Sequence, residues 1–234
     1  MNTFTSLGIA ILIMFILAFL QFIPSIFLLF EHYTYGQNSR TKAAKLSFFF
    51  IAGVYFATAL LYLLIYFIIA SSSMIAYLDR SVYAWIFSGI FIAYCFIMFF
   101  LYYRRGKGTE LFVSRKITQK YTWAAIHSKT SSEAFFLGIT SIIPELLFTL
   151  PLFICSTIEL GVFEANIIPK IIIIVLTILS SIIPLLAIYS AYTNHYNLVI
   201  IQKFRVKNKP FIKLFLGLLY LLIAVIIIAF RIIT

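Results

Sequence analysis

Hydrophobic residues along the chain gather into six long runs that shorter polar segments separate. The runs cover residues 7–30, 46–70, 82–103, 134–158, 167–192 and 211–233. Each has about 20 or more residues, which is the length that a helix needs to cross the hydrocarbon core of a bilayer. Backbone polar groups must be satisfied internally in lipid, so such runs form helices. The pattern therefore predicts an all-α membrane protein with six transmembrane helices.

Composition agrees with a protein embedded in the bilayer. Of the 234 residues, 63% are hydrophobic and only 11% are charged, and the mean hydropathy is +1.08. A water-soluble domain carries about a quarter of its residues as charged side chains. We therefore expect a single integral membrane domain over residues 1–234. The first run follows no Lys or Arg and is too long for a signal-peptide core, so we interpret it as a span.

The loop charges predict an orientation, because cytoplasmic loops are enriched in Lys and Arg. Loops one, three and five hold Arg40, Lys42, Lys45, Arg104, Arg105, Lys107, Arg115, Lys116, Lys120, Lys129, Lys203, Arg205, Lys207 and Lys209. Loops two and four hold only Arg80 and Lys170, against Asp79, Glu159 and Glu164. We expect loops one, three and five in the cytoplasm and both termini outside. The net charge of +11 then faces anionic lipid headgroups, and we expect no nucleic-acid partner.

The long third loop divides the chain into two halves. Residues 1–103 and 134–234 hold three predicted spans each, and the basic loop 104–133 joins them. An odd number of spans gives the halves opposite orientations, which is the inverted-repeat layout of many transporters. Within the loop, Val113, Ile117, Tyr121 and Ala124 form an apolar stripe. The stripe indicates either a basic helix on the inner membrane face or a solvated linker.

Glu145 is the strongest candidate for a functional residue. It lies in an otherwise uncharged run and follows Pro144, with Pro151 further on. A carboxylate at membrane depth is costly and indicates a functional site by default. The two prolines predict a bent or broken helix, since they free the carbonyls of Thr140 and Leu147. Freed carbonyls beside a carboxylate could coordinate a cation or a proton.

Glu145 also belongs to a polar stripe. Gly138, Ser141, Glu145 and Thr149 are spaced three, four and four residues apart, which predicts one helical face. The alternative is a structural carboxyl, protonated by burial or hydrogen-bonded across the bundle. If a cavity exists, its predicted polar lining is Glu145, Ser141, Thr149, Pro144, Gln21, Ser25 and Ser181. The Ser-Ile-Ile-Pro sequences at 141–144 and 181–184 predict similar bends in spans four and five.

Enzyme motifs are missing from the sequence. It contains no P-loop, no His-Glu-x-x-His and no Gly-x-Ser-x-Gly nucleophile elbow. Cys95 and Cys155 form no CxxC pair and no Cys/His cluster, so a zinc site is not indicated. We therefore expect neither an enzyme, nor a cofactor, nor a bound metal.

The chain resembles the lysine-exporter (LysE) superfamily. The likeness rests on the three-plus-three spans with a long basic loop, on the segment Lys42-Ala43-Ala44-Lys45-Leu46-Ser47-Phe48-Phe49-Phe50-Ile51-Ala52-Gly53-Val54, and on Pro144-Glu145 with Pro151. This group includes small-solute and metal exporters, lipid-addressing proteins and the CcdA/DsbD thiol-electron carriers. The thiol carriers place cysteine beside proline in spans one and four, where this chain has Ser25 and Glu145. The resemblance implies a transporter of a bacterial plasma membrane.

Three functions follow as hypotheses. The first is a secondary transporter, an exporter of a small solute or ion, with Glu145 as its coupling or binding group. The second is a non-transporting membrane subunit that assembles or anchors a partner. The third is a thiol-redox carrier, which requires Cys95 and Cys155 to come within disulfide range. The sequence leaves open whether the chain forms a homo-oligomer in the lipid bilayer.

Overall fold

The computed structural model describes residues 3–20, 40–71, 80–102, 109–110, 113–114, 123–124, 127–162, 167–193 and 198–231. The long helices in this part of the chain are α1 (Thr3–Leu20), α3 (Arg40–Ser71), α5 (Arg80–Ile97), α7 (Ser131–Ser141), α8 (Leu146–Val162), α9 (Ile167–Thr193) and α10 (Leu198–Arg231). A π-helical turn η1 (Met98–Tyr102) extends α5, and a 3-10 turn η2 (Ile143–Glu145) separates α7 from α8. Apart from one two-stranded ladder, the described fold is helical, as predicted.

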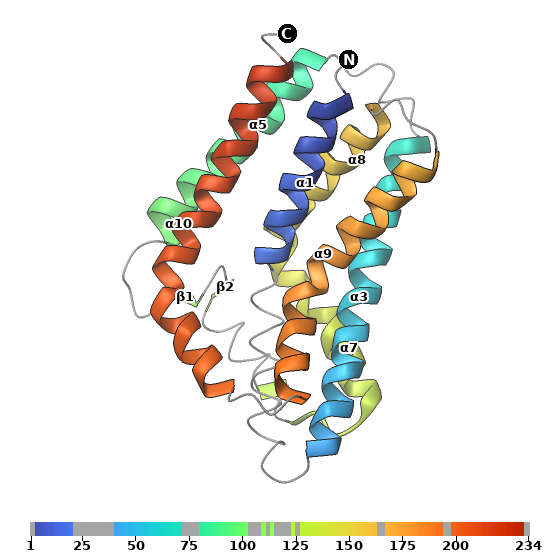
Figure 1. The fold of residues 1–234 in the computed structure, drawn as a ribbon, viewed down its shortest axis with the longest axis vertical. Coiled ribbons are helices and arrows are strands. Elements are labelled where there is room, and N and C mark those ends of the chain that lie inside the picture. The colour runs from blue at the N-terminus through green and yellow to red at the C-terminus, as the bar shows by residue number, and fades with distance from the viewer. Residues whose placement is uncertain are drawn as a thin grey trace.

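The helices stand side by side and alternate in direction (Figure 1). Helix α1 runs away from the end of the molecule at the top of the view, α3 runs back, and the alternation continues through α5, the α7–α8 pair, α9 and α10. The start of α1 and the end of α10 therefore lie at the same end, which we call the terminal end. The opposite end is called the basic end for the side chains described below.

Three of the predicted spans have helices that are long and apolar enough to cross a membrane. These helices cover Thr41–Ser71, Val82–Phe100 and Ile167–Ser190, and the α7–α8 pair makes a fourth if it counts as one bent span. Within the described residues, α1 and α10 contribute shorter apolar stretches, Leu7–Ala18 and Leu214–Ala229. The structure thus has the apolar helices of an integral membrane protein.

Several basic residues predicted in loops lie in helices instead. Helix α3 begins at Arg40 and includes Lys42 and Lys45. Helix α10 begins at Leu198 and includes Lys203, Arg205, Lys207 and Lys209. Lys and Arg are good helix formers, and their long stems let a charge reach the interface from a helix end. Charge therefore did not mark the ends of these helices.

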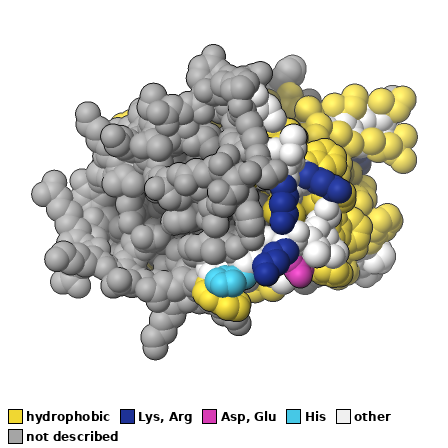
Figure 2. Space-filling view, turned by 90° about the horizontal axis from the view of Figure 1, so that it is seen from below, with side chains coloured by type: hydrophobic (Ala, Val, Ile, Leu, Met, Phe, Trp, Pro, Cys, Tyr) yellow, Lys and Arg dark blue, Asp and Glu magenta, His cyan; other side chains and the backbone are white. Residues whose placement is uncertain are grey.

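Charged side chains gather at the end where α3 and α7 begin. Lys42, Lys45, Lys129, Glu133 and His127 are exposed in this part of the chain, and Figure 2, seen from below, shows basic, acidic and histidine side chains gathered on this face. Glu133 closes a capping box at the start of α7: Thr130 accepts from the Glu133 amide, and the carboxylate accepts from the Lys129 and Thr130 amides. This basic end carries Lys42 and Lys45 of predicted loop one and Lys129 of predicted loop three.

The predicted amphipathic helix of the third loop is wrong at its start. Val113 and Ser114 form strand β2 (Val113–Ser114), which pairs antiparallel with β1 (Thr109–Glu110). β-branched Val and Thr favour a pleated ladder, and a short hairpin satisfies the backbone locally. Ile117 and Tyr121 lie outside the described residues.

Helices α3 and α7 cross with their backbones in direct contact. A Cβ atom built on Gly53 would overlap the carbonyl oxygen of Phe135, and one built on Gly138 would overlap the carbonyl oxygen of Phe50. Small residues allow such close approach, which is how helices associate without a hydrophobic driving force in lipid. Gly138, predicted in a polar stripe, is therefore part of a helix crossing.

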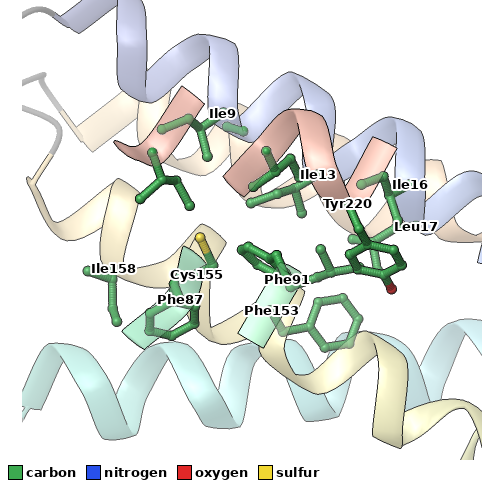
Figure 3. Close-up of a cluster of buried hydrophobic side chains, with 14 of the residues drawn as sticks. Ile9, Ile13, Ile16, Leu17, Phe87, Phe91, Phe153, Cys155, Ile158 and Tyr220 are labelled. Carbon is green, nitrogen blue, oxygen red and sulfur yellow. The ribbon is translucent and has the colours of Figure 1, made fainter. Parts of the chain in front are cut away.

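The buried apolar residues form two clusters. The larger one, the terminal-end core, joins α1, α5, α8 and α10 with parts of α3 and α9, and Figure 3 shows Ile13, Phe91, Phe153 and Tyr220 converging in it. The smaller one, the basic-end core, joins α3, α7 and α9. Its members are Phe50, Ile51, Val54, Leu137, Ile142, Ile182, Leu185 and Ile188.

Candidate functional site

The fourth predicted span is broken at the proline–glutamate pair. Helix α7 ends at Ser141, the turn η2 covers Ile143–Glu145, and α8 starts at Leu146. The two helices meet at an angle of 71°. The predicted bend is therefore confirmed. The single polar face predicted from Gly138 to Thr149 is wrong, because the two residues belong to differently directed helices.

The backbone of Glu145 lies in η2, between the two helix ends. Its side chain lies outside the described residues, as do Gln21 and Ser25 of the predicted lining. Pro144 is partly buried at the start of the same turn. What the structure places from the predicted site is therefore the break itself and the hydroxyl groups around it.

Four buried hydroxyl side chains lie where the two cores meet. On α3, Thr58 follows Val54 of the basic-end core and precedes Tyr62 of the terminal-end core. On α9, Ser181 likewise lies between the cores. Ser141, at the end of α7, is next to Ile142 of the basic-end core, and Thr149 of α8 is next to Phe148 of the terminal-end core. We call Thr58, Ser141, Thr149 and Ser181 the hydroxyl layer.

The contacts of Tyr62 join α3, α8 and α9 close to three of these residues. Its ring meets Phe153 of α8 edge-on, with centroids 5.3 Å apart, and its hydroxyl lies 3.0 Å from Ser156 Oγ. Thr177 of α9 lies beside the same hydroxyl. Helices α3 and α8 run away from the basic end and α9 runs towards it (Figure 1). Thr58, Thr149 and Ser181 each lie four residues, about one helical turn, from Tyr62, Phe153 and Thr177 on the side of the basic end.

The hydroxyls of the layer differ in their hydrogen bonds. Ser141 Oγ donates to the Gly138 carbonyl and Ser181 Oγ to the Ile178 carbonyl, each at 2.7 Å. Thr58 is 1% exposed, and its Oγ1 has no partner, alone among the buried side-chain polar atoms of the described residues. A buried polar atom without a partner is costly, so it indicates a missing water, ion or ligand.

One freed carbonyl of the broken helix has a partner. Pro151 cannot donate to the Leu147 carbonyl, and Tyr94 Oη of α5 donates to it at 2.6 Å. Next to it, Tyr220 Oη of α10 donates to the Phe148 carbonyl at 3.3 Å. The carbonyl of Leu147 therefore has a donor from a neighbouring helix, which is how backbone groups that proline frees are often satisfied, and its coordination of a cation stays a prediction.

A second polar cluster lies nearer the terminal end. Glu159, predicted in loop four, lies in α8 and is 1% exposed. Tyr83 Oη of α5 donates to Glu159 Oε1 at 3.1 Å and lies 3.2 Å from Cys155 Sγ. We call Tyr83, Cys155 and Glu159 the carboxyl cluster. Glu159 was assigned to a loop because charge usually ends a span, whereas here a tyrosine hydroxyl satisfies it within the bundle.

The two cysteines are free thiols in different places. Cys155 of α8 contacts Tyr83 of α5. Cys95 lies twelve residues after Tyr83 on α5, which is about 18 Å along the helix axis. A disulfide needs Cα atoms within about 7 Å. The arrangement gives no support to thiol-redox chemistry between these two residues.

Sequence reasoning missed Thr58, Tyr94 and Glu159. The signal for Glu159 was its spacing, four residues after Cys155 on what is one continuous helix. Thr58 stood four residues before Tyr62 in a run with no other polar side chain between Tyr55 and Tyr62. No sequence signal pairs Tyr94 with Leu147, because that contact depends on how α5 packs against α8.

Comparisons of the chain with protein-family models, with curated proteins and with solved structures found no match. A function for this chain is therefore argued from its site, since a fold alone does not imply one.

Proposed function

We propose that the protein is a six-span secondary transporter that moves a small solute or ion through the region of the hydroxyl layer. The observation that carries the proposal is the break between α7 and α8, together with the buried hydroxyls of the layer on α3, α7, α8 and α9. Transporters bind substrates near the bilayer midplane, at helices that are interrupted there. Non-helical backbone at that depth is tolerated where protein or a water-filled cavity surrounds it.

The helix packing supports two halves of opposite orientation. Helices α1, α3 and α5 of the first half pack mainly against the second half: α1 on α9 and α8, α3 on α7 and α9, and α5 on α10. Contact of the first span with the fifth and of the second with the fourth is the exchange that two halves related by a two-fold axis produce. In this proposal α1 and α10 are the first and sixth spans, and the architecture is similar to that of the lysine-exporter superfamily.

The proposal assigns the basic end to the cytoplasm of a bacterial cell. Lys42, Lys45 and Lys129 lie at that end, and the first residue of α1 lies at the other. By the positive-inside rule, both termini then face outward. A substrate crossing the hydroxyl layer would travel between the basic end and the terminal end.

A second candidate, a non-transporting membrane subunit, is favoured by the contacts of Tyr94 and Tyr220. These two side chains donate hydrogen bonds to the carbonyls of Leu147 and Phe148, next to Pro151. A bundle that satisfies its bend in this way could serve only as a scaffold for a partner protein. Water access to the layer distinguishes the two functions.

The test is the reaction of single cysteines with a membrane-impermeant thiol reagent. Cys95→Ala and Cys155→Ser give a background without thiols, into which Ser181→Cys or Ile16→Cys is introduced. A transporter must open the layer to water from one side, so a methanethiosulfonate should modify the variant at 181 in sided vesicles. Ile16, fully buried in the terminal-end core, is the matched control and should stay unmodified. Equal protection of both positions from both sides would exclude transport through the layer.

A second measurement addresses the coupling role of Glu145. Proteoliposomes with entrapped pyranine report proton flux when opposed gradients of alkali cations or amino acids are applied. Glu145→Gln should abolish a proton-coupled flux that the unchanged protein supports. Glu133→Gln makes the same chemical change at an exposed helix start and preserves the capping box, so it should leave the flux unchanged. Normal flux in Glu145→Gln would remove Glu145 from the mechanism.

A further inference from the structure

We propose that the hydroxyl layer binds a dehydrated alkali cation of the size of Na⁺. The inference deepens the transporter proposal and rests on it for its functional meaning. Three observations support the binding of a cation: the carbonyls to which the serine hydroxyls donate their protons, the unpartnered oxygen of Thr58, and the absence of donor atoms other than oxygen among the described side chains of the layer.

The serine hydroxyls of the layer present lone pairs outward. Ser141 and Ser181 use their protons within their own helices, on the carbonyls of Gly138 and Ile178. A hydroxyl oxygen that donates its proton keeps two lone pairs as acceptor sites. Such oxygens suit a cation and offer no donor to an anion.

Thr58 is the independent observation that points to a ligand. Its Oγ1 is buried and unpartnered. Val54, Thr58 and Tyr62 follow one another at helical spacing on the buried side of α3, and Tyr62 contacts α8 and Ser156. Thr58 therefore lies on the side of α3 that faces the bundle, and a cation held there would give its hydroxyl the partner that it lacks.

The end of α7 adds a negative electrostatic potential. A helix C-terminus carries about half a negative charge, and the interrupted helices of transporters use such ends to coordinate Na⁺. Helix α7 ends at Ser141, inside the layer. The start of α8 would attract an anion instead, but its first amide, on Leu146, already donates to the Ile143 carbonyl of η2.

The donor atoms select the class of cation. The layer offers only oxygen, and among the described residues no group of three or more His, Cys, Asp or Glu side chains could hold a metal ion. Oxygen donors suit hard cations, whereas transition metals prefer imidazole or thiolate. A divalent hard cation takes several carboxylates, and the four described side chains of the layer are hydroxyls. A monovalent alkali cation fits this described set.

The experiment measures thermal unfolding of the purified full chain with a dye that reacts with thiols. Cys95 and Cys155 are both buried, so they report unfolding. Replacing choline chloride by NaCl up to about 200 mM at constant ionic strength should raise Tm by about 3 °C or more, because only the folded state binds the ion. KCl should give less than half of this rise.

Thr58→Val is the variant that decides. It has nearly the same shape and removes the unpartnered oxygen, so the Na⁺-dependent rise in Tm should fall to that of choline. Thr157→Val is the matched control: Thr157 is equally buried on α8 and donates to Phe153 within its own helix, and its variant should keep the rise. Ser181→Ala should weaken the rise, whereas Ser47→Ala, which removes a similar buried hydroxyl of α3, should not.

Each other outcome overturns the cation site. An equal rise in NaCl and KCl would show that the site does not select Na⁺, no rise in either salt would show that it binds neither ion, and a rise that survives Thr58→Val would place the ion elsewhere. The two proposals fail separately. Thiol access to position 181 without a Na⁺ response would leave a transporter for another substrate. A Na⁺ response that Thr58→Val removes, without such access, would leave a structural ion site and no transport.

Discussion

The carboxyl cluster and the hydroxyl layer are two buried polar regions on the same helix α8, and they are satisfied in opposite ways. In the carboxyl cluster, a side chain of α5 bonds to side chains of α8, so the polar groups join two helices. In the hydroxyl layer, Ser141 and Ser181 bond within their own helices, and Thr58 bonds to nothing. One region uses its hydrogen bonds to join helices, while the other contains serines that bond within their helices and one threonine oxygen without a partner.

The difference shows that burial alone does not identify a functional site. Glu159 is the most deeply buried charged side chain of the described residues, yet its contact with Tyr83 is an interhelical bond that accounts for it. Thr58 is less conspicuous in the sequence, but its missing partner calls for a ligand. The predictions below separate loss of stability from loss of ligand response in these two regions.

Gly138→Ala should have the largest effect. The new methyl group would overlap the Phe50 carbonyl and force α7 away from α3, which should lower the free energy of unfolding by about 3 kcal/mol. Thermal unfolding in detergent measures the loss. The Na⁺-dependent rise in Tm should also shrink, since α7 carries Ser141, whereas the carboxyl cluster should keep its protection in hydrogen exchange.

The controls for the crossing are Gly8→Ala and Gly89→Ala. A Cβ at either position meets nothing within 4 Å, so these variants should be as stable as the unchanged protein. Gly53→Ala should resemble Gly138→Ala, and the double variant should cost less than the sum of the two, because the helices separate only once. Stability of Gly138→Ala equal to that of Gly89→Ala would contradict the close crossing.

Tyr83→Phe should have the next largest effect. Removing the hydroxyl takes a donor from the buried Glu159 carboxyl, which should cost about 2 kcal/mol. If the carboxyl cluster serves only to join α5 and α8, this variant loses stability without losing a ligand. It should therefore retain the full Na⁺-dependent rise in Tm. Tyr55→Phe, at an exposed position of α3, is the control and should change neither quantity. Loss of the Na⁺ response in Tyr83→Phe would move the ligand site to the carboxyl cluster.

How far the sequence predicted this structure depends on whether the cause was local. Hydropathy located the apolar part of every helix, because a span needs a fixed length of apolar residues. The break at Pro144 was also predictable, since proline removes a hydrogen bond of its own helix. The same Ser-Ile-Ile-Pro sequence at 181–184 predicted a bend in α9, but α9 continues through Pro184 as one helix. That outcome depends on packing, so no local rule distinguishes the two prolines.

The candidate site was predictable only in part. Ser141, Thr149 and Ser181 were expected in a polar lining, and the structure places them at the junction of the two cores. Thr58 was not expected, because one threonine in an apolar run usually bonds to its own helix. Its oxygen is notable because it has no hydrogen-bond partner, and the sequence carries no signal of that. Glu145 remains a prediction from the sequence.

Tyr94→Phe should have a smaller effect of about 1 kcal/mol, through loss of the bond to the Leu147 carbonyl that Pro151 leaves open. The cycle with Pro151→Ala sharpens the test. Alanine restores the backbone donor for Leu147, so Tyr94→Phe should cost less in that background than in the unchanged protein. Thermal unfolding of the four proteins measures the coupling. Equal costs in both backgrounds would mean that Tyr94 does not compensate for the proline.

Thr58→Val should have the smallest effect on stability and the opposite sign. Without Na⁺, the substitution removes a buried oxygen that no hydrogen bond satisfies, so unfolding should cost about 1 kcal/mol more than in the unchanged protein. With saturating Na⁺ the order should reverse, because only the unchanged protein gains binding free energy. Thr157→Val, which gives up a bond of 2.6 Å to Phe153, should lower stability equally in both salts. A lower Tm for Thr58→Val in the absence of Na⁺ would mean that its oxygen is satisfied, and the distinction between the two buried regions would then disappear.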